Sequence, residues 1–385
     1  MKRIALIVLM CALVLPLAAK KTQRGIDQLR YPAMGKIPAT AVLKAATSQG
    51  IRLRLIPDTR LPLVNVDIRI KGGSPWDPAD KVGLSDVTAE LLRIGGTEGM
   101  TSAQVDQFLE SRGIELAVYS NGDYFSVSIS CLKGNLDDAL SMLARLLMKP
   151  GFAADKLDEI KTRSASGIAR RNDEPQGIMM REFDRILYGA SPYGRVMEYA
   201  HLDAISVADI AQVHQRFFAP DNLLVGVTGP LTIDELQGKV EKVFNGWTGK
   251  AEIPPQPQID ESAIDFKLAL AAKDNLNQSY IAIGHLGEVY DVDQDAPISV
   301  FNQIFSQSMD SRLFNRVRTQ LGLTYGVFGG IYPSYLHRGS TYFGTFTKSE
   351  STMAAIQAIR EEIERIRKEP VSESELNAAK DFFRN

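Results

Sequence analysis

The chain has 385 residues, of which 44% are hydrophobic and 23% charged, and its formal net charge is -2. This length suits about two domains, the composition is that of an ordinary folded protein, and so small a charge excludes an electrostatic case for a nucleic-acid partner. Of the two cysteines, Cys11 lies in the leader described next, so a processed chain keeps only Cys131 and forms no internal disulfide. We expect Cys131 to be a buried thiol.

Residues 1–19 have the pattern of a secretory signal peptide. Lys2 and Arg3 precede an apolar run that ends in small residues. The run is too short to cross a membrane comfortably. A lipid anchor on Cys11 and an uncleaved leader are the alternatives. We expect a periplasmic or secreted chain without a stable membrane span after cleavage.

The first half reads as one domain over residues 48–248, preceded by a polar, proline-bearing linker at 20–47. Alternating residues predict strands, and apolar residues at helical spacing predict helices. Ser102 is expected to cap one helix, and Asn121-Gly122 predicts a hairpin turn. The expected strands are 51–56, 64–70, 114–118, 124–131 and 223–227, and the expected helices are 84–94, 103–112, 136–147, 154–171, 178–187, 207–217 and 233–244.

A proline-rich linker at 249–262 separates the halves, and residues 263–385 are expected to form a second domain. Its predicted strands are 266–271 and 279–285, and its predicted helices are 296–306 and 311–320.

The second half repeats the first. Residues 100–118 align with 309–327 at an offset of 209 without a gap, and Tyr124 to Ser128 align with Tyr342 to Phe346 at an offset of 218. Three further positions match at an offset of 219. We therefore predict two copies of one α+β unit, each an antiparallel sheet with helices on one face. The second copy ends early, so we expect a fragment or an incomplete last unit with an open sheet edge.

The helix at 84–94 has a second face formed by Asp86, Ala89 and Glu90. Their spacing is that of the zinc-binding helix His-x-x-Glu-His, but the residues differ. The chain has four histidines and no two lie three or four residues apart, which excludes a zinc site built on a helical histidine pair. A zinc held by distant histidines and a hard cation between Asp86 and Glu90 remain alternatives to a solvated or lysine-paired face.

This helix, the repeated α+β unit and the strand entry Pro220-Asp221-Asn222 together resemble the M16 peptidase family, from about Ser48 to the end of the chain. The resemblance implies a LuxS/M16 metallopeptidase-like half-clamshell. In active members, histidine, glutamate and histidine stand at the positions of Asp86, Ala89 and Glu90. A glutamate, the third ligand, stands at the position of Gly167. All four positions depart from the active pattern, so we expect no zinc and no other cofactor in this chain.

A second family motif is retained at Arg318 and Tyr325, seven residues apart on a helix–turn–strand. The resemblance implies that these side chains bind the substrate backbone. An arginine ending a helix and a tyrosine filling a strand is the alternative. Arg312 also fits the family pattern, and we expect a structural role for it.

These expectations combine into one function. The chain would be the non-zinc, substrate-gripping subunit of an exported metallopeptidase that cleaves extended peptides. Its partner would be a zinc-bearing M16 subunit in a heterodimer, with a homodimer as the other possibility. The main rival is a peptide-binding or assembly scaffold without a proteolytic role. A self-sufficient hydrolase with an unrecognised site is the second rival.

Overall fold

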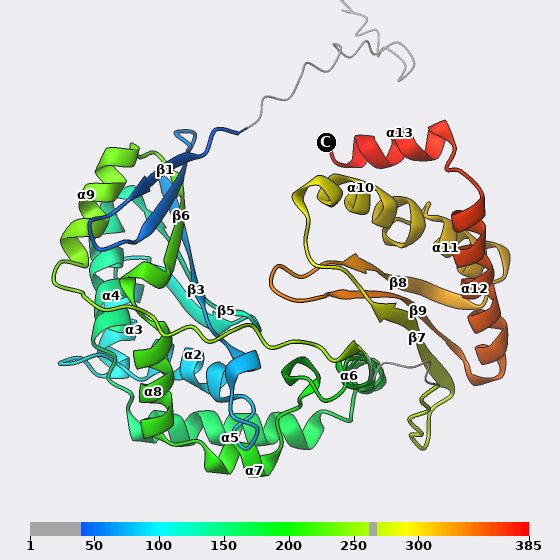
Figure 1. Cartoon of the computed structure of the whole chain (residues 1–385), viewed down its shortest axis with the longest axis horizontal. Coiled ribbons are helices and arrows are strands. Elements are labelled where there is room, and N and C mark those ends of the chain that lie inside the picture. Colours follow the sequence, from blue (N-terminus) through cyan, green and yellow to red (C-terminus); the bar gives the residue numbers. More distant parts are fainter. Residues whose placement is uncertain (1–39, 262–267, 385) are drawn as a thin grey trace, which may run out of the picture. The chain divides into compact units, whose positions relative to one another are not determined.

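The computed structural model describes residues 40–261 and 268–384, so the expected signal peptide lies outside the described residues. A six-stranded sheet organises the first half (Figure 1). Its spatial order is β1-β2-β6-β3-β5-β4, with β2 and β6 parallel and the other pairs antiparallel. The strands are β1 Leu43–Ala46, β2 Arg52–Pro57, β3 Leu63–Lys71, β4 Glu115–Ser120, β5 Tyr124–Leu132 and β6 Leu223–Gly229.

The two faces of this sheet differ because side chains alternate along each strand. On β3, the residues Val64, Val66, Ile68 and Ile70 are buried and the residues between them are exposed. The buried side chains join a core that includes residues of α2, α3, α4, α8 and α9, so helices cover one face only. The helices of this half are α2 Leu84–Ile94, α3 Ser102–Glu110, α4 Leu136–Met148, α5 Ala154–Arg170, α6 Pro175–Tyr188, α7 Tyr199–Ala204, α8 Val207–Phe217 and α9 Ile233–Val243.

The second half contains a three-stranded antiparallel sheet in the described residues, in the order β7-β9-β8. Phe305, Leu313, Val317, Phe343 and Ile359 form the centre of its core. Its elements are β7 Gln278–Leu286, α10 Val292–Asn302, the π-helix η7 Gln303–Gln307, α11 Arg312–Phe314, the π-helix η8 Asn315–Gln320, β8 Thr324–Tyr332, β9 Ser340–Lys348, α12 Thr352–Lys368 and α13 Glu373–Phe382.

The α+β fold class is confirmed, and several local predictions are wrong. Thr101, not Ser102, caps α3, because its side chain and that of Gln104 form a reciprocal capping box. The expected linker before residue 48 contains β1, which pairs with β2. The strand expected at 266–271 lies partly outside the described residues, and Leu268 to Ala271 form no strand. The sequence pattern also did not reveal α7. It did not predict that β6, the last of these six strands in the chain, lies between β2 and β3 and pairs with β2 in parallel.

The helices and strands of the two aligned regions occur in the same order along the chain, at the offsets of the sequence repeat. The α3–β4 segment and the η8–β8 segment are helix–turn–strand units at the offset of 209, and β5 and β9 follow them. α4 and α5 correspond in the same way to α12 and α13. Duplication of one unit remains a prediction, and this shared order agrees with it.

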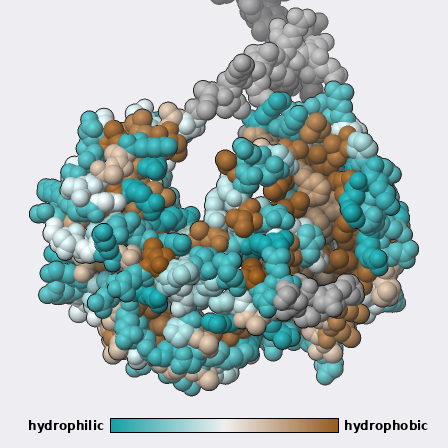
Figure 2. Space-filling model, viewed as in Figure 1, coloured by the Kyte–Doolittle hydropathy of each residue, from teal (hydrophilic) through white to brown (hydrophobic). Residues whose placement is uncertain are grey.

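No helix in the described part of the chain is long and apolar enough to span a bilayer. In the space-filling view, hydrophilic residues cover much of the visible surface and separate hydrophobic groups interrupt them (Figure 2).

Candidate functional site

The N-terminus of helix α2 is hydrogen-bonded to the side chain of Asp77, which lies before the helix. The Asp77 carboxylate accepts hydrogen bonds from the amides of Gly83 (3.0 Å) and Ser85 (3.1 Å) and from the Ser85 hydroxyl (2.6 Å). First-turn amides have no partner within a helix, and a negative charge is favourable there. Burial raises the pKa of Asp77 to about 7, against the lowering effect of these hydrogen bonds. Asp77 therefore sets where α2 starts.

The four positions that correspond to the zinc site lie on two helices that pack together. Ala89 is buried in the core under the first sheet, whereas Asp86 is exposed. Gly167 lies on an exposed part of α5. The apolar stripe of α2 packs on α5 through Leu84, Val87, Leu91, Leu157 and Ile160.

The residues present do not fit a catalytic zinc. Glu90 forms an ion pair with Arg163 of α5, so a guanidinium already neutralises one of the two carboxylates. Ala89 supplies no base and Gly167 no ligand. Among the described residues, no group of three or more His, Cys, Asp or Glu side chains could hold a metal ion.

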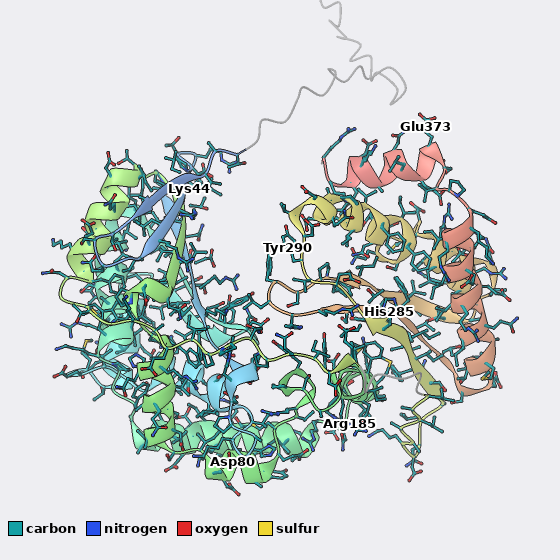
Figure 3. The ribbon with its side chains drawn as sticks, viewed as in Figure 1. Lys44, Asp80, Arg185, His285, Tyr290 and Glu373 are labelled. Atoms are coloured by element: carbon teal, nitrogen blue, oxygen red, sulfur yellow. The ribbon has the colours of Figure 1, made fainter. Side chains whose placement is uncertain are left out.

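The four histidines have other contacts. His285 lies on β7 (Figure 3). Burial lowers the pKa of His214, because an apolar environment favours the neutral imidazole over the charged one. The ring-nitrogen contacts are His201 Nδ1 with the Glu198 amide (3.1 Å), His214 Nε2 with the Leu147 carbonyl (2.9 Å), His285 Nδ1 with the Leu286 carbonyl (2.7 Å) and His337 Nδ1 with the Arg338 carbonyl (2.7 Å).

The structure brings Arg318 and Tyr325 into contact. The Arg318 Cζ lies 4.7 Å from the centroid of the Tyr325 ring and 4.7 Å from that of Phe314. Tyr325 is 77% exposed. In the described residues, the Arg318 guanidinium has these two ring contacts but no carboxylate partner. Its N–H donors are therefore held in place by aromatic rings and left available for a ligand.

Two backbone irregularities place these side chains. Arg318 lies in η8, a π-helix, which holds more residues per turn than an α-helix and so changes the face on which a residue lies. Tyr325 lies in a bulge of β8, where the pairing jumps from Thr324↔Thr347 to Val327↔Thr345. The Thr324 hydroxyl stabilises this bulge by donating to the Phe346 carbonyl (2.6 Å) and accepting from the Gly326 amide (3.1 Å). π-helical turns and bulges both occur often at functional sites.

The first half has neither irregularity at the corresponding place. At the offset of 209, Arg318 corresponds to Leu109 and Tyr325 to Leu116, which are 2% and 7% exposed. α3 is a regular α-helix, and β4 pairs with β5 without a register shift. The two segments that align in sequence thus differ, since one contributes core residues and the other an exposed Arg–Tyr pair.

Arg312 has the structural role that we expect. Its guanidinium forms two bonds to the Glu375 carboxylate of α13, at 2.6 and 3.0 Å, and one to the Pro370 carbonyl. The hydrogen bonds from Arg312 lower the pKa of Glu375 to about 2. Arg312 is 8% exposed, so it joins α11 to α13 inside the fold.

A shallow groove of about 340 Å³ lies on the open face of the first sheet, over β3, β4 and β5. β4 is one of the two outer strands of this sheet, and β8 is an outer strand of the second. The polar residues that line the groove are Asn65, Asp67, Glu115, Ser128 and Ser130.

Two residues described above were not identified from the sequence, one beside Arg318 and one before α2. Phe314, the second ring against Arg318, lies four residues before it, a spacing that predicts contact on a helix. Asp77 lies too far before α2 for a capping motif to identify it.

Two family profiles match the chain. "Insulinase (Peptidase family M16)" covers residues 55–200 and "Peptidase M16 inactive domain" covers residues 204–383. Among similar proteins, "Non-peptidase homolog YmxG" of Helicobacter pylori is 23% identical over 329 residues, which are 84% of this chain and 74% of that protein. "Uncharacterized zinc protease Mb2805c" of Mycobacterium bovis is 22% identical, over 90% of this chain and 80% of that protein.

The fold also matches a solved structure. The crystal structure of the "peptidase M16 inactive domain from Pseudomonas fluorescens" superposes with a TM-score of 0.82 at 22% identity, and the match covers 90% of this chain and 84% of that one.

Proposed function

This chain belongs to the M16 peptidase family, and we propose that it is the non-zinc subunit of an exported metallopeptidase, holding extended peptides for a zinc-bearing M16 partner. The observation that carries the proposal is the displayed Arg318–Tyr325 pair. The chain keeps this pair, whereas the four positions of the zinc ligands on α2 and α5 hold no zinc-binding set. A chain that retained neither site would favour a purely structural protein.

The chemistry of the pair suits a peptide backbone. An arginine presents several N–H donors in a fixed plane, and a carbonyl oxygen accepts them. The Tyr325 hydroxyl supplies a further donor at an exposed position. Stacking between two rings holds the guanidinium, which lowers the conformational entropy lost on binding.

An extended peptide can also pair with an outer strand. β4 and β8 each have a neighbour on one side only within their sheets. Addition of a strand to a sheet edge uses backbone hydrogen bonds and leaves alternate side chains to be selected by the sheet face. The groove along β3, β4 and β5 offers polar contacts to those side chains.

In this proposal the partner performs hydrolysis. Its zinc would activate a water molecule that attacks the scissile amide, while this chain orients the peptide. Export through the signal peptide, association as a heterodimer and descent from a duplicated unit belong to the same proposal. The name "non-peptidase homolog" of one relative supports a chain without its own catalytic zinc.

The test is peptide cleavage by a mixture of this chain with the zinc-bearing M16 protein that co-purifies with it from the native host. We expect Arg318→Ala and Tyr325→Phe to lower turnover about 10-fold or more, because each removes a donor to the bound peptide. Arg316→Ala is the matched control, since Arg316 lies in the same π-helix but pairs with Glu361 at 3.1 Å. Tyr335→Phe is the control for an exposed tyrosine.

Unchanged turnover in both variants would remove the role assigned to the pair. Peptide binding without any co-purifying zinc protein would favour the scaffold function instead. Chelator-sensitive cleavage by this chain alone would point to an independent hydrolase.

A further inference from the structure

A buried polar cluster joins the two halves of the chain away from the Arg318–Tyr325 pair. It contains Asp123 from the β4–β5 turn, Tyr193 from the loop after α6, Gln256 from the linker and His337 from the β8–β9 turn. Asp123 is 6% exposed, so its carboxylate needs partners inside the protein. The cluster therefore brings four segments of the chain together around the Asp123 carboxylate.

The neighbours of Asp123 satisfy that charge from three sides. Gln256 Nε2 donates to Asp123 Oδ1 at 2.9 Å and lies 2.5 Å from the Tyr193 hydroxyl. His337 Nε2 lies 3.4 Å from Asp123 Oδ2. Burial raises the pKa of Asp123, and the charge of His337 opposes that rise.

The two nitrogens of His337 both face acceptors. Nδ1 lies 2.7 Å from the Arg338 carbonyl, which accepts only, and Nε2 faces the Asp123 carboxylate. A neutral imidazole has one N–H, so it can donate to one of these partners but not to both. A doubly protonated ring could donate to the Arg338 carbonyl and pair with Asp123 at the same time. The ring is stacked on Tyr193, with the centroids 3.9 Å apart, and meets Tyr188 edge-on.

Other charged and titratable groups surround the cluster. Lys71 of β3 acts on Asp123, and Asp184 of α6 acts on Tyr188. Burial raises the pKa values of Tyr188 and Tyr193 to about 12, so neither phenol competes for protons near neutral pH. Arg338 is held separately, by Glu261 at 2.6 Å and by the Gly287 carbonyl at 2.7 Å. Among these groups, an imidazole is the type that titrates near neutral pH.

We propose that His337 is a pH-dependent latch that ties the β8–β9 hairpin to the first half of the chain when its ring is protonated. A neutral ring loses the ion pair with Asp123 and leaves a buried carboxylate short of a donor. The turn then keeps the ring contacts of His337 with Tyr188 and Tyr193 and the contacts of Arg338 with Glu261, but it lacks the charge pairing with Asp123. Because β8 also carries Tyr325, the latch fixes the position of this site relative to the first sheet.

The direction with pH follows from the charges. The ion pair is complete where His337 is protonated and Asp123 ionised, and it is lost as pH rises through the titration of the imidazole. The test compares about pH 6 with about pH 8, because histidine is the residue type whose charge ordinarily changes in this range.

The test is amide hydrogen exchange of the whole chain, with each rate divided by the intrinsic rate at the same pH. We expect protection of the peptide containing His337 to fall about fivefold or more between pH 6 and pH 8, the lower end of typical coupling effects. His337→Gln and Asp123→Asn should remove that pH dependence. His285→Gln is the matched control, because His285 lies on β7 and contacts only a neighbouring carbonyl.

The wild-type series needs no variant, so the test survives if a variant fails to fold. Protection at His337 that is equal at both pH values would overturn the latch. A pH response that persists in folded Asp123→Asn would overturn it as well, because the ion pair would then play no part.

Discussion

The α3–β4 segment and the η8–β8 segment are matched in sequence position but not in what they expose. In the first, Leu109 and Leu116 complete a hydrophobic core. In the second, a π-helical turn and a bulge carry Arg318 and Tyr325 to the surface. The difference shows that a fold of this kind needs apolar residues at these positions only where the local backbone is regular. In the irregular segment, Tyr325 is 77% exposed and does not contribute to the core.

The largest effect is expected from exchanging residues between the segments. Leu109→Arg would bury an unpaired guanidinium, and we expect it to lower the free energy of unfolding by about 4 kcal/mol or more. Arg318→Leu should change it by less than about 0.5 kcal/mol, since Arg318 packs only on two partly exposed rings. Urea unfolding followed by circular dichroism measures both. Equal losses in the two variants would contradict the comparison.

A second effect concerns Arg312, which corresponds to the exposed Ala103 in the first half. Arg312→Met should lower the unfolding free energy by about 2 to 3 kcal/mol, because it leaves Glu375 without its guanidinium. The pKa of Glu375 is lowered to about 2, so its contribution is complete above the unfolded value of about 4.3. It is lost as pH falls from there toward 2.

The free energy of unfolding, measured as pH falls, tests whether the ionised Glu375 carboxylate causes the stability difference between wild type and Arg312→Met. Wild type should lose more stability than Arg312→Met between about pH 5 and pH 2. Ala103→Met is the control at the corresponding exposed site, and it should alter neither stability nor its pH dependence.

Tyr325→Leu copies the first half into the second and should lower peptide affinity rather than stability. We expect about a 10-fold rise in Kd for an extended peptide, which is roughly 1.4 kcal/mol, from the lost hydroxyl and the lost ring under Arg318. Calorimetric titration measures the affinity, and urea unfolding should change by less than about 0.5 kcal/mol. Intact affinity would place the peptide elsewhere.

The smallest effect is expected in the first half, at Glu90, which corresponds to a zinc ligand in the pattern of active members. Arg163→Ala breaks the ion pair with Glu90, and both side chains are partly exposed. We expect a loss of less than about 1 kcal/mol, which shrinks further in high salt. A larger loss would mean that this pair substitutes for a metal in holding α2 against α5.

The sequence predicted the features that depend on neighbours along the chain. Alternation along β3, the Asn121-Gly122 hairpin and the stripe of α2 each follow from residues within a few positions. The lack of zinc ligands is a property of residue identity alone. Family resemblance added the register that singled out Arg318 and Tyr325, and the structure places these two in contact.

By itself, then, the sequence determined the local elements, the core-facing residues and the residue types at the positions of the zinc ligands, because periodicity and side-chain identity are local. Only the tertiary structure decided the rest. It placed β6 between β2 and β3, capped α2 with Asp77, inserted the π-helical turn before Tyr325 and brought Asp123 to His337. The place of β6 and the contact of Asp123 with His337 join residues far apart in the chain. Asp77 and the π-helical turn are closer in sequence, but burial and pairing decide them and no pattern of residue spacing records these energies.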